Sequence, residues 1–435
     1  MKTIPVGLLG YGTIGQGVIK LLRRHARLIE DRLGARLELA GVADPDLSRP
    51  RKVKAAKRLL TPDPYRLIRD PKIPLIVELI GDWPGVKEMI LAALRAGKSV
   101  VTANKALLAR HGRELFAEAA RRGVDIYYEA SVAGGVPIIR TLREGLIANQ
   151  IQAVYGIVNG TCNYILTEMS QGHGDFHTIL KEAQAQGYAE ANPAADVEGY
   201  DASHKLAILV QLGFGVPIKL SQIYREGITA LAPADFEAAA EFGFAIKLLA
   251  MAKLKDGRVE ARVHPTLIPA RSLLADVGGV FNAVYVVGDF VGPTLFYGRG
   301  AGMDPTASAV VSDLMELARN YLAGRPGRRL PSGSFQDHRP QKLRVMPQRE
   351  VVSEYYLRMQ VKDRPGVLSK ISGQLAREKI SISAVQQRGQ GKGAVPIVML
   401  THSAPEAAME RALKRLNRLA VVHKPIQRIR IETSF

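Results

Sequence analysis

Gly10, Gly12 and Gly15 have the G-x-G-x-x-G spacing of sequences that bind the pyrophosphate of a dinucleotide. The motif follows an apolar strand-like segment and opens a segment whose apolar residues recur at helical spacing. In this context Gly10 permits a tight turn, Gly12 lets the backbone approach a phosphate, and Gly15 lets the helix pack on the strand. Phosphate charge would lie at the helix N-terminus, beside Thr13 and Ile14. We therefore expect a dinucleotide cofactor, with an ordinary glycine turn as the alternative.

An acidic residue, Asp44, follows the second strand-like segment, where a carboxylate can accept a hydrogen bond from a ribose hydroxyl. This favours NAD, because the carboxylate would repel the 2′-phosphate of NADP. Arg49 and Lys57 follow closely, with further basic residues between them, and could neutralise that phosphate. The sequence therefore leaves both cofactors open, and the basic residues could equally form a solvated helix face.

Lys105 follows Thr102, the last residue of another strand-like segment. In an open α/β sheet, ligands bind beyond the carboxyl ends of the strands, so we expect Lys105 to face a ligand. A surface lysine in the first turn of a helix would have the same position.

Asp201 and Lys205 stand four residues apart at the start of an expected helix that continues with apolar residues. The pair therefore begins on a face near the core. Spacing alone favours an ordinary surface ion pair, and a functional pair remains the alternative.

The elements that must position these residues form three expected domains and a linker. Strands alternate with helices through residues 1–131, which predicts a parallel sheet. The pattern over 132–303 is of α+β type, and Asp304-Pro305 resembles the N-cap and first residue of a helix to about 324 that returns to the first domain. A basic linker rich in proline and glycine, 325–349, precedes a β-α-β-β-α-β order typical of a ferredoxin-like domain, 350–435.

The composition excludes several classes of protein. A chain of 435 residues with 47% hydrophobic and 23% charged residues is neither disordered nor fibrous. The net charge of +19 is compatible with polyanion binding, but aromatic residues make up only 6% and none interleaves with the basic cluster 49–54, so we expect no nucleic-acid partner. The single cysteine excludes an internal disulfide. Without an apolar run of ~20 residues or a signal-peptide pattern, we expect a cytoplasmic protein without a membrane partner.

Several segments together resemble homoserine dehydrogenase, in family order and over essentially the whole chain. The C-terminal segment resembles an ACT domain, a ferredoxin-like module that binds small ligands, often amino acids. The segments that carry the resemblance are the glycine motif, Thr102–Lys105, Glu129–Pro137, Asn159–Leu166, Gly187–Lys205 and, for the ACT domain, Asp363–Leu368.

The resemblance implies a reversible, NAD- or NADP-dependent interconversion of L-aspartate 4-semialdehyde and L-homoserine, in threonine, methionine and isoleucine biosynthesis. By position, Lys205 matches the family's proton donor and acceptor, Lys105 its second active-site lysine, and Asp201 the partner of substrate and lysine. Glu190 matches the carboxylate that holds the substrate ammonium. We therefore expect catalysis by Lys205, Lys105 and Asp201.

Three sets of binding residues are expected from the motif and the resemblance together. For the substrate they are Glu190, Asp201, Lys105 and Gly187. For the cofactor they are Gly10, Gly12, Thr13, Ile14, Gly15, Asp44, Arg49, Lys57, Thr102, Lys105, Gly187 and Gly302. The resemblance also implies a sodium ion bound by the backbone carbonyls of Glu129, Val132, Gly134 and Val136, since oxygen ligands suit a hard cation.

The sequence departs from the family pattern at two positions. Asp82 follows Gly81 where the family commonly has a second glycine, so cofactor contacts there are expected to differ. Cys162 replaces a common threonine, which we expect to alter packing only.

The resemblance also implies an amino-acid effector at the ACT domain, for which L-threonine, the pathway product, is the candidate, and a homodimer or homotetramer. The ACT domain is expected to be regulatory, with catalysis independent of it. Two alternatives remain, a catalytically silent amino-acid sensor and a dehydrogenase of another short amino alcohol.

Overall fold

The computed structural model describes residues 1–435 except 325, 328–330, 332, 336–342 and 388–392. It divides into two compact units. Unit 1 comprises 1–158, 203–221 and 282–343, and unit 2 comprises 159–202, 222–281 and 344–435. The expected linker, 325–349, lies partly outside the described residues.

Unit 1 begins with a six-stranded sheet in the order β3-β2-β1-β4-β5-β6, with every neighbouring pair parallel. The alternation of strands and helices correctly predicted this parallel sheet. Its elements are β1 (Lys2–Leu9), α1 (Thr13–Arg24), α2 (Ala26–Leu33), β2 (Ala35–Ala43), β3 (Leu60–Thr61), α3 (Pro64–Arg69), β4 (Leu75–Glu78), α4 (Val86–Arg95), β5 (Ser99–Thr102), α5 (Lys105–Arg122) and β6 (Ile126–Tyr127).

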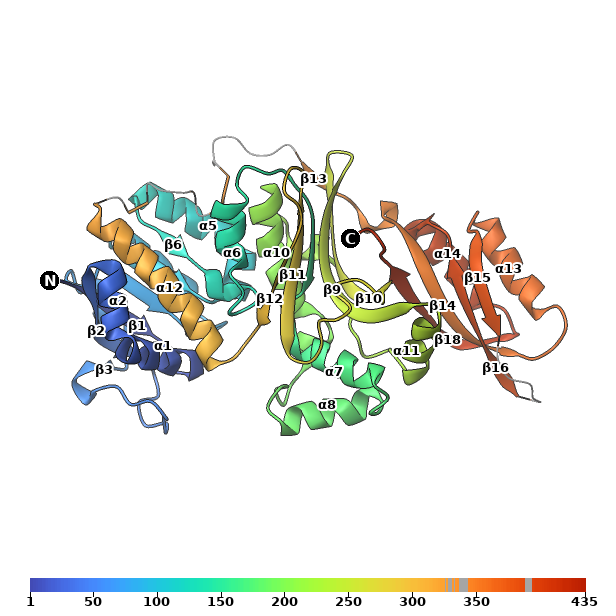
Figure 1. Ribbon diagram of the computed structural model, residues 1–435, viewed down its shortest axis with the longest axis horizontal. Helices are drawn as coiled ribbons and strands as arrows, with labels where there is room; N and C mark the ends of the chain where they lie inside the picture. The colour runs from blue at the N-terminus through green and yellow to red at the C-terminus, as the bar shows by residue number, and fades with distance from the viewer. Residues whose placement is uncertain (325, 328–330, 332, 336–342, 388–392) are drawn as a thin grey trace. The chain divides into compact units, whose positions relative to one another are not determined.

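Helices cover the sheet because successive strand residues point to opposite faces. On one face, Val6 and Leu8 of β1 share a buried core with Val18 of α1 and with Val310 of α12 (Met303–Leu322), which lies beside α1 in Figure 1. On the other face, Gly7 approaches the side chain of Leu67 in α3. The C-terminal helix α12 is therefore part of the core of the N-terminal sheet.

Two helix boundaries differ from the sequence predictions. The single helix expected from Thr13 is divided at His25, whose backbone leaves the helical region at φ −110° and ψ 22°. Helix α12 begins at Met303 with Gly302 as its N-cap, so the predicted start at Asp304-Pro305 is wrong. Pro305, the third residue of the helix, is tolerated because the N–H groups of the first turn have no partner within the helix. Asp304 instead forms an ion pair with Lys20 of α1, at 2.8 Å.

Unit 1 also contains three strands in the order β12-β11-β7. These are β7 (Ile151–Ile157), β11 (Phe281–Gly288) and β12 (Gly292–Arg299), and the short helix α6 (Ile138–Arg140) precedes them. The boundary between the units falls within α10 (Tyr200–Phe214) and after the first residue of β11.

Unit 2 contains a long antiparallel hairpin followed by the C-terminal module. Strands β9 (Phe244–Lys255) and β10 (Arg258–Pro269) pair along their full length. The other elements of this part are α7 (Gly160–Ser170), α8 (Phe176–Ala185), α9 (Ala194–Val197), β8 (Tyr224–Arg225), α11 (Pro233–Glu241) and β13 (Arg344–Val345). Strand β13, at the end of the expected linker, pairs with β10.

The C-terminal module has the predicted β-α-β-β-α-β order, and its sheet order is β18-β14-β16-β15. One buried core joins α13, α14 and the inward face of β14. Its elements are β14 (Val352–Lys362), α13 (Val367–Arg377), β15 (Ile382–Gln387), β16 (Ala394–Thr401), β17 (Ala404–Pro405), α14 (Glu406–Leu416) and β18 (Val422–Ile431). Thr266 and Leu267 of β10 pair in parallel with Arg430 and Ile431 of β18, so the hairpin and the module share one sheet.

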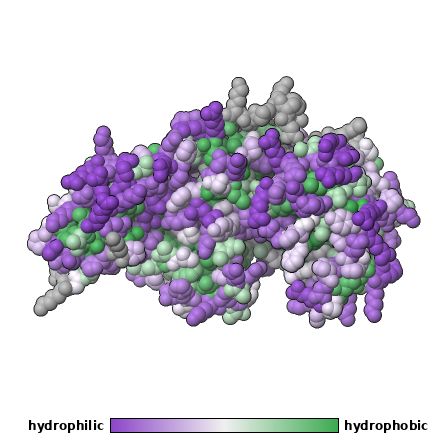
Figure 2. All heavy atoms as spheres, turned by 180° about the vertical axis from the view of Figure 1, so that it is seen from behind, coloured by the Kyte–Doolittle hydropathy of each residue, from purple (hydrophilic) through white to green (hydrophobic). Residues whose placement is uncertain are grey.

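Hydrophilic residues dominate the face drawn in Figure 2, where apolar residues form scattered patches. Within the described part of the chain, no helix has both the length and the apolarity that a membrane span requires.

Candidate functional site

The glycine motif forms the turn between β1 and α1. Gly10 has φ +99°, and a Cβ atom there would lie 2.6 Å from the backbone of Leu79. A Cβ atom on Gly15 would lie 2.2 Å from the carbonyl oxygen of Gly10, whereas one on Gly12 would meet nothing within 4 Å. Only glycine therefore fits at the turn and at the contact with the helix, and Gly12 borders open space. Gly12 is also the N-cap of α1 and provides no capping side chain, so this helix N-terminus is suited to a phosphate.

Asp44 lies beside this turn and is held by three donors. Its Oδ2 atom accepts a hydrogen bond from the Tyr11 N–H at 2.7 Å, and its Oδ1 atom accepts one from the Asp46 N–H at 3.0 Å. The guanidinium of Arg51 is 3.0 Å from Asp44 Oδ1 and stacks over the Tyr11 ring, 4.4 Å from its centroid. Arg51 therefore balances the charge of Asp44.

Arg51 is one of the basic residues that follow Asp44 in the sequence, but of this group only Arg49 and Lys57 were predicted to bind the cofactor. Arg49 and Lys57 are exposed, whereas only 6% of the Arg51 side chain is exposed. The sequence could not rank the basic residues, because they follow one another in a segment without regular periodicity.

Thr102 and Lys105 lie at the carboxyl end of β5, as the sequence predicted. Thr102 ends the strand and is fully buried, and Lys105 begins α5 after the N-cap Asn104. Both residues belong to unit 1, as do the glycine turn and Gly302. Gly302, with φ +114°, is the N-cap of α12.

Asp201 and Lys205 both lie in α10, one turn apart. Asp201 is 7% exposed and Lys205 is 9% exposed, so the surface ion pair that spacing alone favoured is wrong. The Lys205 Nζ atom donates a hydrogen bond to the Val158 carbonyl oxygen at 2.6 Å. In its neutral form, a buried amine at this position can accept a proton.

Asn159 holds the carboxylate of Asp201 in unit 2. Its Nδ2 atom donates to Asp201 Oδ2 at 2.9 Å and to Asp196 Oδ1 at 2.7 Å, while its Oδ1 atom caps α7 through the Cys162 N–H. Asn159 and Asp196 lie in segments that carry the family resemblance, but neither residue was predicted to have a role. An asparagine just before a helix was the available signal.

The remaining expected substrate residues lie in the loop after α8, also in unit 2. Gly187 has φ +75° and ends the turn that follows α8. Glu190 has an exposed side chain, and its carbonyl oxygen accepts a hydrogen bond from Gln184 at 3.0 Å. An exposed carboxylate on a loop is suited to binding an ammonium group.

The segment expected to bind sodium makes a tight turn. Ala133 and Gly134 are successive left-handed residues, at φ +53° and +52°, and a Cβ atom on Gly134 would lie 2.3 Å from the Gly300 carbonyl oxygen. The carbonyl oxygens of Glu129 and Val136 each accept one N–H group and keep a second lone pair for a cation. These carbonyl oxygens are therefore ligands of the type that a hard cation prefers.

The Glu129 side chain is committed elsewhere. Its two carboxylate oxygens accept the N–H groups of Ile139 at 2.8 Å and Arg140 at 2.7 Å, at the start of α6. Burial raises the pKa of this carboxyl group and also that of Asp313, which accepts the Glu129 N–H. Among the described residues, no group of three or more His, Cys, Asp or Glu side chains could hold a metal.

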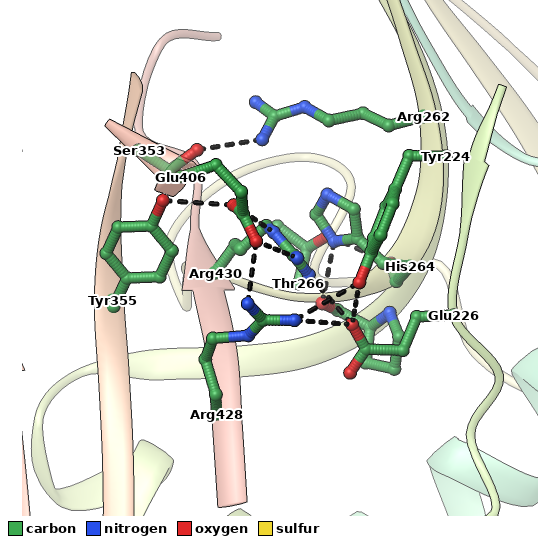
Figure 3. Close-up of polar contacts among 11 residues, drawn as sticks. Tyr224, Glu226, Arg262, His264, Thr266, Ser353, Tyr355, Glu406, Arg428 and Arg430 are labelled. Atoms are coloured by element: carbon green, nitrogen blue, oxygen red, sulfur yellow. Dashed lines mark hydrogen bonds and ion pairs between the residues drawn. The ribbon is translucent and has the colours of Figure 1, made fainter. Parts of the chain in front are cut away.

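A second buried cluster, within unit 2, joins β10 to the C-terminal module (Figure 3). Arg430 of β18 binds Glu406 at 2.5 Å and Glu226 at 2.9 Å, and Arg428 binds the same two carboxylates. Arg262 of β10 donates to the Ser353 hydroxyl at 2.8 Å. We call these residues the junction cluster, because they connect the hairpin, the loop after β8 and the module.

Electrostatic interactions within the junction cluster are strong because Arg430 and Glu406 are fully buried. Burial alone would raise the pKa of Glu406, but Arg430 and Arg428 lower it overall. Burial opposes the charge of Arg430, yet Glu406 raises the pKa of this guanidinium. Glu406 and Arg430 are therefore both charged, and each depends on the other to remain so.

The N-terminal sheet is parallel, with a glycine turn after its first strand and an acidic residue after its second. This arrangement is typical of oxidoreductases that bind a dinucleotide cofactor. Three family models match in order, "Homoserine dehydrogenase, NAD binding domain" over residues 10–129, "Homoserine dehydrogenase" over 137–315 and "ACT domain" over 355–421. The chain belongs to the homoserine dehydrogenase family.

Relatives match over the full length. The homoserine dehydrogenases of Neisseria gonorrhoeae and Pseudomonas aeruginosa are each 44% identical, covering 100% and 99% of this chain and 99% of their own. The crystal structure of a homoserine dehydrogenase from Thiobacillus denitrificans superposes with a TM-score of 0.94 at 45% identity, over 100% of this chain and 99% of its own. The family and the enzyme class predicted from sequence are confirmed, and neither alternative is favoured.

Proposed function

We propose that this homoserine dehydrogenase interconverts L-homoserine and L-aspartate 4-semialdehyde with Lys205 as the general acid and base. In the oxidation, the neutral amine of Lys205 accepts the hydroxyl proton while the hydride leaves the carbon that bears the hydroxyl group. The bound nicotinamide supplies the hydride acceptor or donor. Lys105 stabilises the oxygen as its charge develops. The observation that carries this proposal is the burial of Lys205 in α10, with its Nζ atom held at the Val158 carbonyl.

Substrate binding is assigned to residues in the loop after α8 and in the first turn of α10. Glu190 and Gly187 bind the ammonium end of the amino acid. Asp201, which Asn159 holds in place, orients Lys205 and the substrate. The carboxylates and the lysines together select a short amino acid over an uncharged alcohol.

The cofactor is NAD or NADP, and we assign its selection to Asp44 and Arg51. Gly10, Gly12, Thr13, Ile14 and Gly15 would hold the pyrophosphate, with Thr102 and Gly302 at the nicotinamide end. A hyperthermophilic archaeal homoserine dehydrogenase, 26% identical with a TM-score of 0.62 over 75% of this chain, has been solved in complex with NADPH. We propose that Arg51, with Arg49 and Lys57 nearby in sequence, binds the 2′-phosphate when NADP is used.

Three further assignments rest on the family and on local structure. The carbonyls of Glu129, Val132, Gly134 and Val136 would hold sodium and stiffen the turn. The loop before α13, Asp363–Leu368, would hold an amino-acid effector, for which L-threonine is the candidate. The oligomer is proposed to be a homodimer or homotetramer.

An absorbance assay at 340 nm tests the function directly. The purified full chain, given L-homoserine and either cofactor in the oxidised form, should produce NADH or NADPH. Replacing L-homoserine by a short amino alcohol without a carboxylate should abolish the signal. Cofactor binding without any absorbance change would instead identify a silent sensor.

A further inference from the structure

Glu78 is a completely buried carboxylate that none of the roles above uses. It ends β4 and pairs with Leu9 of β1 on one side and Thr102 of β5 on the other. Strands β1 and β4 are the neighbours at which the strand order β3-β2-β1-β4-β5-β6 reverses. Ligands of open α/β sheets bind in the crevice at such a switch point. Glu78 therefore lies directly beneath the edge where the cofactor is proposed to bind.

Glu78 receives donors from two loops at this edge. Its Oε1 atom accepts the N–H groups of Ile80 at 2.7 Å and Gly81 at 3.3 Å, in the loop after β4. Its Oε2 atom accepts the hydroxyl of Thr102 at 2.6 Å, at the end of β5. Three donors on one carboxyl group fit the ionised form, which only accepts. Burial nevertheless raises the pKa of Glu78, and these hydrogen bonds oppose that effect.

Asn104 closes the connection between the same two loops. Its N–H donates to Thr102 Oγ1 at 3.1 Å, and its side-chain Nδ2 donates to the Gly81 carbonyl at 2.6 Å. Its Oδ1 atom accepts the Leu107 N–H at 3.0 Å and so caps α5, whose first residue is Lys105. The four residues Glu78, Gly81, Thr102 and Asn104 form a closed ring of hydrogen bonds.

We propose that Glu78 is a positioning residue of the enzyme, which acts through this ring. It fixes the loop after β4 against the start of α5, so that the cofactor edge and the backbone of Lys105 keep one relative position. This inference rests on the proposed placement of the cofactor and of Lys105.

Glu78→Gln tests the proposal, because an amide of the same shape has one accepting oxygen and cannot receive all three donors. We expect the KM for the cofactor to rise and kcat to fall, each by about 10-fold or more, the loss of a hydrogen bond to a charged group. The KM for L-homoserine should change less than about threefold, since Glu78 touches no residue assigned to the substrate ammonium. A purely structural role would reduce the active fraction and leave both KM values unchanged.

Asn104→Asp provides a second variant, which keeps the helix cap but loses the donor to the Gly81 carbonyl. It should show the same KM-against-kcat pattern, and the double variant should be little worse than either single one because both break one ring. Glu118→Gln, which removes a buried carboxylate from the far end of α5, is the matched control and should behave like the wild type. Should Glu78→Gln fail to fold, Asn104→Asp decides alone.

Two results would overturn the inference. One is a folded Glu78→Gln enzyme with wild-type cofactor KM and kcat. The other is full additivity of the two variants. Failure of the underlying function is recognised separately, because in that case the wild-type chain itself would not oxidise L-homoserine.

Discussion

Two lysines carry the proposed chemistry: Lys205, within α10, transfers the proton, and Lys105, the first residue of α5, stabilises the reacting oxygen. Replacing Lys205 or Lys105 by methionine preserves length and apolar packing but removes the amine. We expect kcat with L-homoserine to fall by at least the ~10² typical of general acid/base loss, with the fold retained. Steady-state rates and circular dichroism of the full chain measure both effects. The exposed Lys181 of α8, changed to methionine, should leave the rate unaltered. More than half of the wild-type kcat in either variant would remove that lysine from its assigned role.

Asp44 and Arg51 lie 3.0 Å apart, and we propose that cofactor choice depends on the charge balance between them. Asp44→Ser removes the carboxylate that would repel a 2′-phosphate and leaves Arg51 to bind it. We expect the ratio of kcat/KM for NADP to that for NAD to rise about 10-fold, equivalent to ~1.4 kcal/mol. Arg51→Ala should shift the ratio the other way. Asp46→Ser, in the same loop, serves as the control, and an unchanged ratio in Asp44→Ser would place that residue away from the ribose.

Sequence reasoning at this scale found residues whose neighbours in the chain give them meaning. The glycine turn and Lys105 were identifiable because a strand precedes them and a helix follows. Glu78 was not, since Thr102 is 24 residues away and only folding brings the two together. Arg51 could not be ranked above the other basic residues that follow Asp44. Burial was equally invisible, so Asp201 and Lys205 resembled a surface pair.

At the scale of elements, the junction cluster connects β18 and α14 to β10 and so stabilises the hairpin. Glu406→Gln leaves Arg430 buried without its main charge partner, which we expect to lower the free energy of unfolding by about 3–5 kcal/mol. Urea unfolding of the full chain, followed by fluorescence, measures the loss. Glu350→Gln breaks the exposed pair with Arg258 and should cost no more than about 1 kcal/mol. Equal stabilities for the two variants would show that the junction cluster contributes little.

Element types followed from hydrophobic periodicity, whereas element ends depended on tertiary contacts. Period and turn residues predicted the parallel sheet and the β-α-β-β-α-β order. The start of α12 was misplaced because Asp304-Pro305 is a common N-terminal signal, yet Asp304 is drawn to Lys20 of α1. Nothing local to Asp304 could reveal a partner 284 residues away.

For the whole molecule, regulation is the property to test. L-threonine at saturation should weaken substrate use 5- to 150-fold, the range of a coupling of ~1–3 kcal/mol. Gly366, at φ +84°, is the N-cap of α13; a Cβ atom there would meet no neighbour within 4 Å, but its left-handed backbone disfavours any residue with a branched side chain. Gly366→Val should strain this loop and abolish the response while leaving the basal rate intact. An undiminished response would place the effector elsewhere, and no response in the wild type would reject L-threonine.

Truncation near Pro347 separates a regulatory from a structural role of the module. The sequence alone suggested that catalysis would survive, but β10 pairs with β18, and Arg262 bonds Ser353. Removing the module exposes the edge of β10 and leaves the buried Arg262 without the Ser353 hydroxyl. We therefore expect the truncated chain to unfold at a lower temperature than the full chain, measured by circular dichroism. A truncated chain with wild-type stability and activity would show that the module is dispensable.

The position of β18 between β10 and β14 has a consequence for how the protein is made. The sheet of unit 2 is completed by residues 422–431, near the end of the 435-residue chain. The N-terminal sheet strands, from Lys2 to Tyr127, emerge from the ribosome long before it, because synthesis proceeds at roughly 5–20 residues per second. Until Arg430 emerges, β10 has an open edge and Glu406 lacks its principal cation. A polypeptide that ends before Arg430 would therefore have a second unit that stays exposed to aggregation and proteolysis.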